Sequence, residues 1–150
     1  MSIKSQEANM RKLAGLLSHD LSYIWGERES GPNGDKRAFL KQGRNFLWVL
    51  AKDLKLHDVK INTNPGGIAV SGECSVTGMW ENQGIYIQLS QPTYDRERVL
   101  IYRTIQHSRD CTGGQNHFLT QSDLKLRSYY WLLEQLSALR KGRASYGWAA

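Results

Sequence analysis

Polar side chains that can bind or neutralise charge are most concentrated in one short stretch, Tyr102 to His117, with the sequence YRTIQHSRDCTGGQNH. Guanidinium groups hold phosphates and carboxylates through paired hydrogen bonds, and a Gly-Gly turn lets backbone amides approach an anion closely. The stretch therefore predicts an anion or nucleotide contact. The residues expected to make it are Arg103, Arg109, Asp110 and Asn116. The alternative is a solvated surface loop in which Asp110 only forms a turn.

Two histidines of the same stretch, His107 and His117, are candidates for the acid and base of a small hydrolase or nuclease. Imidazole titrates near neutral pH, so two of them can divide the protonated and neutral roles. Arg103 or Arg109 would then stabilise a developing negative charge. The alternative is that the two histidines are unrelated surface groups.

No motif in the chain indicates a metal or a cofactor. It has no HExxH, no paired carboxylates and no cysteine cluster, and its two cysteines, Cys74 and Cys111, do not form a CxxC pair. The segment GGQNHFL lacks the Lys-Ser/Thr of a phosphate-binding loop, and no GxSxG is present. We therefore expect no metal, no cofactor and no acyl transfer. Cys74 is expected to be a small buried side chain in a strand.

Aromatic residues near the ends of the expected strands suggest a second kind of contact. Tyr86 and Tyr102, together with Trp80, are candidates for an exposed surface that stacks on bases or binds a protein. This requires one face of the sheet to be open. The alternative is that a helix covers these rings.

Helical spacing of apolar residues predicts three helices that would support these side chains. The first lies between residues 8 and 25, the second between 36 and 56, and the third runs from Thr120 to Arg140, where Thr120 and Asp123 resemble a capping box. The outward positions of the second helix are rich in Lys and Arg. Its Gly43 is expected to permit the close approach of another helix; the alternative is that the second helix is locally weak.

Alternation of apolar and polar residues predicts four strands, over residues 59–63, 68–77, 85–90 and 99–106. The connections between them are too short for parallel crossovers, so antiparallel pairing is expected. The fold class is therefore α+β: a small, mostly antiparallel four-stranded sheet with two N-terminal helices and one C-terminal helix, in the order α-α-β-β-β-β-α. Residues 1–150 are expected to form a single domain, with residues 144–150 as a disordered tail.

The net charge of +6 is unevenly distributed along the 150 residues. Residues 1–56 carry ten Lys and Arg against six Asp and Glu, and residues 118–150 carry five against two, whereas residues 57–117 carry five against six. The basic excess therefore lies on the helices and the tail. No stretch is apolar enough to span a bilayer or serve as a signal peptide, so a cytoplasmic protein without membrane contact is expected.

Size, basicity and the absence of a complete catalytic signature favour a non-enzymatic binding module, of the small accessory kind that mobile elements such as phages and plasmids encode. Its expected partner is nucleic acid or a protein that handles nucleic acid. This hypothesis predicts that Arg103, Arg109 and the basic residues of the second and third helices share one surface. The alternatives are the hydrolase or nuclease that uses His107 and His117, and a homo-oligomeric inhibitory or structural protein that uses the aromatic sheet face.

Overall fold

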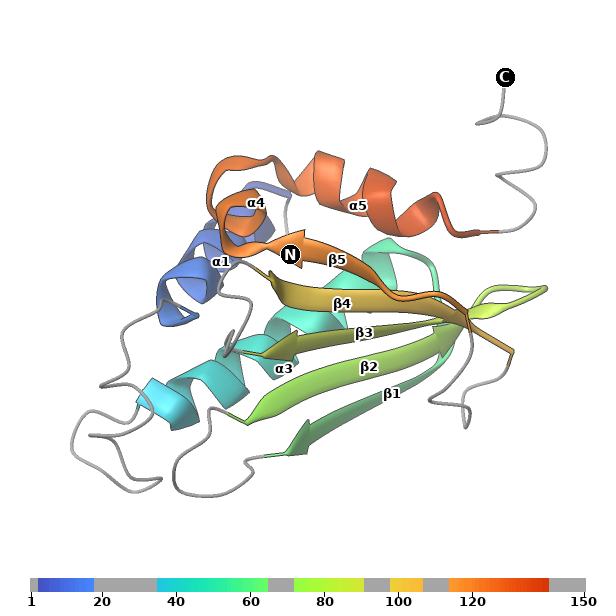
Figure 1. Cartoon of the computed structure of the whole chain (residues 1–150), viewed down its shortest axis with the longest axis horizontal. Coiled ribbons are helices and arrows are strands. Elements are labelled where there is room, and N and C mark those ends of the chain that lie inside the picture. Colours follow the sequence, from blue (N-terminus) through green and yellow to red (C-terminus); the bar gives the residue numbers. More distant parts are fainter. Residues whose placement is uncertain (1–2, 18–34, 65–71, 91–97, 107–113, 141–150) are drawn as a thin grey trace.

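A computed structural model describes residues 3–17, 35–64, 72–90, 98–106 and 114–140 of the chain (Figure 1). Three of the candidate residues, His107, Arg109 and Asp110, lie outside these described residues, as do Cys111 and the expected tail at 144–150.

The sheet has five strands, not the four that the sequence predicts, and all neighbours pair antiparallel in the order β1-β2-β3-β4-β5 (Figure 1). The strands are β1 His57–Asn64, β2 Glu73–Met79, β3 Gly84–Ser90, β4 Arg98–Ile105 and β5 His117–Thr120. The additional strand, β5, is only four residues long, and it forms because it pairs with β4. The α+β class and the antiparallel pairing are as predicted.

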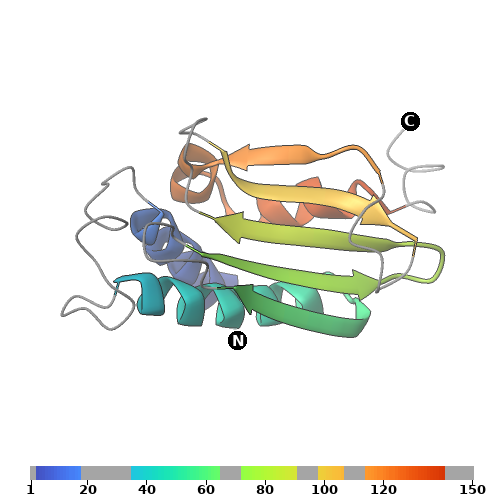
Figure 2. The same ribbon diagram turned by 60° about the horizontal axis from the view of Figure 1, so that its bottom comes forward.

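The described helices are α1 Ile3–Leu16, α3 Asp35–Asp53, α4 Gln121–Leu126 and α5 Tyr129–Ser137. Figures 1 and 2 show α1, α3 and α5 on one side of the sheet and α4 at the end of β5. The core lies between the helices and the face of the sheet that they pack against, which is called the covered face here. Its fully buried side chains include Leu13, Phe46, Leu47, Leu50, Cys74, Val76, Ile85, Ile87, Leu89 and Leu100.

Gly43 brings α3 close to the sheet. A Cβ atom at this position would lie 2.7 Å from the Sγ atom of Cys74, which is nearer than two such atoms can approach. Close packing at Gly43 is as predicted, but the neighbour is strand β2 and not another helix as expected from the sequence. Cys74 is itself fully buried, as predicted, and burial together with the charge of Glu73 raises the pKa of its thiol to about 12.

The C-terminal helical region is two helices, where the sequence pattern predicts one. The capping box is confirmed: the Asp123 amide donates to Thr120 Oγ1 at 3.1 Å, and the Thr120 amide donates to Asp123 Oδ2 at 2.9 Å. The first helix ends at Leu126, because Ser128 caps a new one by accepting from the Trp131 amide at 3.0 Å. A cap side chain satisfies amides that have no partner within the helix.

A small buried polar network joins α1, α3 and α5. The hydroxyl of Tyr129 donates to Asp53 Oδ2 at 2.6 Å, and the backbone amide of Tyr129 donates to Glu7 Oε2 at 2.9 Å. Gln6 donates to the carbonyl of Phe46 at 3.0 Å. Burial, and then the bonded Asp53 carboxylate, raise the pKa of Tyr129 above its ordinary value. Three helices are thus held in register by polar contacts as well as by apolar packing.

No helix among the described residues combines the length and the apolar composition that a membrane crossing requires.

Candidate functional site

The face of the sheet that points away from the helices is called the open face here. Strand register places its residues in rows across the sheet, because residues directly opposite each other in a sheet share a face. One such row runs from Lys60 through Thr77 and Tyr86 to Arg103. Figure 2 shows that none of the described helices crosses in front of this face. The open face also carries Asn62, Asn64, Glu73, Ser75, Gln88, Ser90, Ile101 and Phe118.

Three of the predicted binding residues meet at the centre of the open face. The guanidinium carbon of Arg103 lies 4.2 Å from the centroid of the Tyr86 ring. Arg103 Nη1 also donates to Asn116 Oδ1 at 3.0 Å, and the Tyr86 hydroxyl donates to Gln88 Oε1 at 2.6 Å. The Tyr86 ring is only 8% exposed. The cluster therefore presents the guanidinium group of Arg103, with the Tyr86 ring behind it, in place of a bare ring.

A second arginine of the same kind was not among the predicted residues. Arg98 lies with its guanidinium carbon 4.2 Å from the centroid of the Phe118 ring. The register of β4 shifts between Arg98 and Leu100, so Val99 and Leu100 both face the core and Arg98 falls on the open face. A bulge commonly redirects a side chain in this way. The adjacent apolar pair Val99-Leu100, in an otherwise alternating strand, is the sequence signal that could have revealed it.

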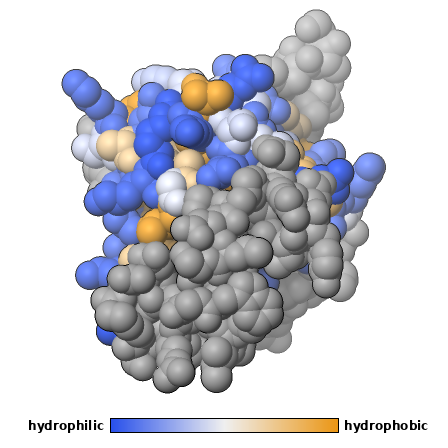
Figure 3. Space-filling model, turned by 60° about the vertical axis from the view of Figure 1, so that its left-hand side comes forward, coloured by the Kyte–Doolittle hydropathy of each residue, from blue (hydrophilic) through white to orange (hydrophobic). Residues whose placement is uncertain are grey.

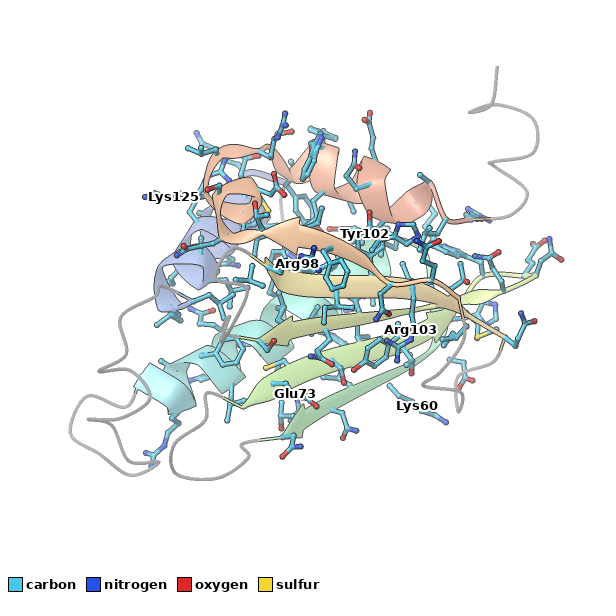
Figure 4. The ribbon with its side chains drawn as sticks, viewed as in Figure 1. Lys60, Glu73, Arg98, Tyr102, Arg103 and Lys125 are labelled. Carbon is cyan, nitrogen blue, oxygen red and sulfur yellow. The ribbon has the colours of Figure 1, made fainter. Side chains whose placement is uncertain are left out.

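A similar irregularity occurs in the edge strand β1. Its register shifts between His57 and Lys60, where Asp58 has a positive φ of 54°. As a result His57, opposite Met79, and Lys60, opposite Thr77, both lie on the open face. Among the described residues of this face, three permanent cations stand against the single carboxylate of Glu73; Figure 4 labels Lys60, Arg98 and Arg103.

Tyr102 lies on the other face, so it does not form one surface with Tyr86. It is opposite Ile87 and His117 in the sheet and is 6% exposed. Its ring stacks on that of His117, with centroids 5.2 Å apart, and burial raises its pKa. Trp80, the third predicted aromatic, is buried and donates from Nε1 to the carbonyl of Leu54 at 2.8 Å.

The position of His117 bears on the acid-base hypothesis. His117 shares the covered side of the sheet with Tyr102, whereas Arg103 lies on the open face. The two side chains therefore leave the sheet in opposite directions and do not converge, while His107 and Arg109, the other residues of this hypothesis, lie outside the described residues. No group of three His, Cys, Asp or Glu side chains suited to a metal ion occurs within the described ranges.

The basic residues of α3 lie on the far side of the sheet from Arg103. Lys41, Arg44, Lys52 and Lys55 are all exposed. They line the same stripe as Trp48, which is 47% exposed and has the Lys52 ammonium 5.3 Å from its ring centroid. Because α3 packs against the covered face, the single basic surface that the sequence hypothesis predicts is divided in two.

The end of the molecule formed by α1 and α4 is mixed in character. Figure 3 shows it as mainly hydrophilic, with separate apolar spots, where it is coloured. Leu126 and Tyr130 are 74% and 63% exposed, and the Arg127 guanidinium carbon lies 4.9 Å from the Trp131 ring centroid. Lys125 and Arg127, the cations expected from the C-terminal helix, are at this end and do not extend the open face.

Comparison with known proteins gives no assignment: the chain matches no family model, no curated protein and no solved structure. What the open face can do must therefore be derived from its own chemistry. It offers two guanidinium groups whose central carbons lie over aromatic rings, a further ammonium group, and amide and hydroxyl side chains between them. These groups bind anions and planar rings.

Proposed function

We propose that this chain is a non-enzymatic binding protein that holds nucleic acid on the open face of its sheet. The observation that carries the proposal is the pair of stacked arginines, Arg98 on Phe118 and Arg103 on Tyr86, on one face. Lys60 lies on the same face, three strands away from Arg103. A polyanion with planar bases is the ligand whose chemistry uses both the charge and the flat guanidinium groups.

The arrangement of the arginines favours this ligand for an energetic reason. A flexible arginine loses side-chain entropy when it binds, but one that already lies on a ring has lost part of that freedom in the free protein. In general, a guanidinium group binds phosphate oxygens through N–H groups that lie in its own plane. The Asn116 oxygen further fixes the orientation of Arg103. The open face is therefore preorganised for an anionic, planar partner.

The two alternative functions lack comparable support. The acid-base alternative uses His107 and His117 with Arg103 or Arg109; His107 and Arg109 lie outside the described residues, and His117 lies on the opposite side of the sheet from Arg103. Self-association through the open face would bring Lys60, Arg98 and Arg103 of one copy against those of another, and like charges at short range repel. Of the two aromatic rings that such an interface could use, that of Tyr86 is buried beneath Arg103, and that of Phe118, 38% exposed, has the Arg98 guanidinium over it.

The proposal is tested by measuring binding to labelled DNA and RNA, single- and double-stranded, at two salt concentrations. The variant is the double substitution Arg98→Ala, Arg103→Ala; the matched control is Lys41→Ala, Arg44→Ala, which removes the same charge from α3. We expect salt-sensitive binding that the open-face variant weakens at least about tenfold and the α3 control changes by less than about threefold.

Circular dichroism and thermal melting of both variants establish that the comparison is made between folded proteins. Equal losses in the two variants would mean that any positive surface suffices, and the open face would then have no specific role. The absence of binding at low salt for the wild-type chain would refute the proposal as a whole.

A further inference from the structure

The chemistry of the open face also selects among nucleic acids. We infer that its ligand is a single strand, which lies across the sheet with bases stacked on the guanidinium groups of Arg98 and Arg103. This inference rests on the proposed function and goes beyond it by naming the structural class of nucleic acid. Three features of the open face support it: its width, the stacked arginines and their separation.

The width of the face argues against a duplex. Neighbouring strands are about 4.8 Å apart, so the five strands span about 19 Å between β1 and β5. The major groove of B-form DNA is about 12 Å wide and admits a helix or a two-stranded ribbon. A sheet face of this width is broader than the undistorted groove and would meet mainly the outer phosphates of a B-form duplex. A single strand has no groove and can follow the surface.

The stacked arginines argue for exposed bases. A guanidinium group that lies on a ring with one surface can receive a nucleobase on the other, and bases that are not paired in a helix are free to take that position. In a duplex, each base is already stacked on its neighbours, and only its edges are accessible. Arg98 is exposed, and Arg103 is half-buried above Tyr86. With a duplex as the ligand, neither Arg98 nor Arg103 could stack on a base.

The separation of the groups fits a short strand. Arg98 and Arg103 are five positions apart on β4, which at about 3.4 Å per residue, less the bulge, places them about 15 Å apart. Stacked nucleotides are also spaced by about 3.4 Å, so this distance corresponds to about four or five nucleotides. Lys60 lies three strand spacings from Arg103, about 14 Å, and would contact the continuing phosphate backbone.

The register shifts of β1 and β4 place side chains along the proposed route of the single strand over the open face. Without the shift in β4, regular alternation would place Arg98 on the same face as Leu100 and Tyr102, and its side chain would point into the core. The shift in β1 adds His57 to the face beside Lys60. Both irregularities thus place a nitrogen-bearing side chain on the open face, where it can contact a strand that crosses from β5 toward β1.

Single-stranded DNA and single-stranded RNA present the same phosphates and stacking bases, so both are included in the test. The purified full chain is titrated with fluorescent 12-nucleotide DNA and RNA strands of mixed sequence. Two further probes are the corresponding 12-base-pair duplex and a 12-nucleotide strand of abasic sites, which keeps the phosphates and removes the bases. The variants are Arg98→Lys and Arg103→Lys, with Arg44→Lys on α3 as the matched control.

We expect the mixed-sequence strand to bind at least about tenfold more tightly than either the duplex or the abasic strand. Each open-face Arg→Lys variant should bind that strand with about fivefold lower affinity, although its charge is unchanged. The reason is that a lysine cannot stack on a base as a guanidinium group does. The Arg44→Lys control should bind like the wild type. A difference between DNA and RNA would identify which strand is the better ligand.

Equal affinity for the duplex, or for the abasic strand, would overturn the inference and leave nucleic-acid binding in place through phosphates alone. Unchanged affinity in both open-face Arg→Lys variants would also overturn it, because it would exclude guanidinium stacking. If none of the four probes binds at low salt, the proposed function and the inference fail together.

Discussion

The two faces of the five-stranded sheet come from the same strands but are built for different purposes. On the covered face, Ile85, Ile87 and Leu89 of β3 are fully buried against the helices. On the open face of the same strand, Tyr86 and Gln88 bond to each other beneath Arg103. Burial of apolar surface stabilises the first face, whereas the polar and charged groups of the second contribute little to stability. Stability and binding can therefore be changed separately.

The largest difference in stability is expected between two neighbours on β3. Ile87→Ala removes a fully buried side chain and leaves a cavity, so the free energy of unfolding should fall by about 3 kcal/mol. Gln88→Ala, on the open face, should cost less than about 1 kcal/mol. Urea denaturation of the two variants measures both values. Similar losses at the two positions would show that the open face is also covered.

The next effect concerns the polar network behind the covered face. Tyr129→Phe removes the hydroxyl that donates to Asp53 at 2.6 Å and should lower the free energy of unfolding by about 2 kcal/mol. Tyr130→Phe, at an exposed neighbour, is the control and should have almost no effect. Thermal melting of the two variants checks this, and an equal shift of the melting temperature in both would contradict the buried role of the Tyr129 hydroxyl.

The same network predicts the direction of the pH dependence. Burial raises the pKa of Tyr129 in the folded chain above the value of about 10 that it has when unfolded. The unfolded state therefore releases this proton first, and stability is full below pH 10 and falls as the pH rises above it. Cys74, whose pKa is raised to about 12, acts in the same direction from a lower pH. The loss of stability at alkaline pH should be smaller in Tyr129→Phe than in the wild type. Urea denaturation of both proteins at several values between pH 8 and pH 11 measures this difference.

A smaller effect is expected where β5 meets α4. Thr120→Ala removes the side-chain oxygen that accepts from the Asp123 amide, and loss of such a cap costs about 1 kcal/mol. Thr120→Ser keeps the oxygen and should recover most of the stability. If the serine variant is as unstable as the alanine variant, the effect comes from packing of the methyl group and the cap is unimportant.

The smallest effect on stability is expected on the open face. Arg98→Lys and Arg103→Lys should each change the free energy of unfolding by about 0.5 kcal/mol, because each removes one partly exposed cation–ring contact. Guanidinium denaturation of the two variants checks the values. A loss comparable to that of Ile87→Ala would mean that these arginines are structural, and their place in a binding surface would have to be given up.

The sequence predicts the parts of the fold whose signal is local. The alternation Ile85, Ile87, Leu89 and the pairing of Thr120 with Asp123 each depend on a few adjacent residues, and both appear as predicted. Strand β5 could not be found in this way, since four residues show too little alternation and its existence depends on pairing with β4. The division of the last helix at Ser128 was likewise missed, because neither Gly nor Pro marks it.

The candidate site could be predicted only in part for a similar reason. The alternation shows which residues share a face, so Tyr86 and Arg103 could be named as candidates, but it does not show which face the helices cover. Tyr102 was placed with Tyr86 although strand parity separates them. Simple alternation places Arg98 on the covered face with Leu100, but the register shift beside Val99 moves it to the open face. Such a shift depends on how β4 pairs with β5, which the sequence of β4 alone does not show.

Nucleic acid is proposed to bind the open face of the sheet and not the basic stripe of α3. The most direct measurement is a map of backbone amide chemical shifts by NMR spectroscopy during titration with a single-stranded 12-nucleotide oligonucleotide. We predict that the largest changes occur at Tyr86, Ile101, Arg103 and Phe118, while Lys41, Arg44 and Trp48 change little. The largest changes along α3, or uniform small changes over the whole surface, would contradict the claim.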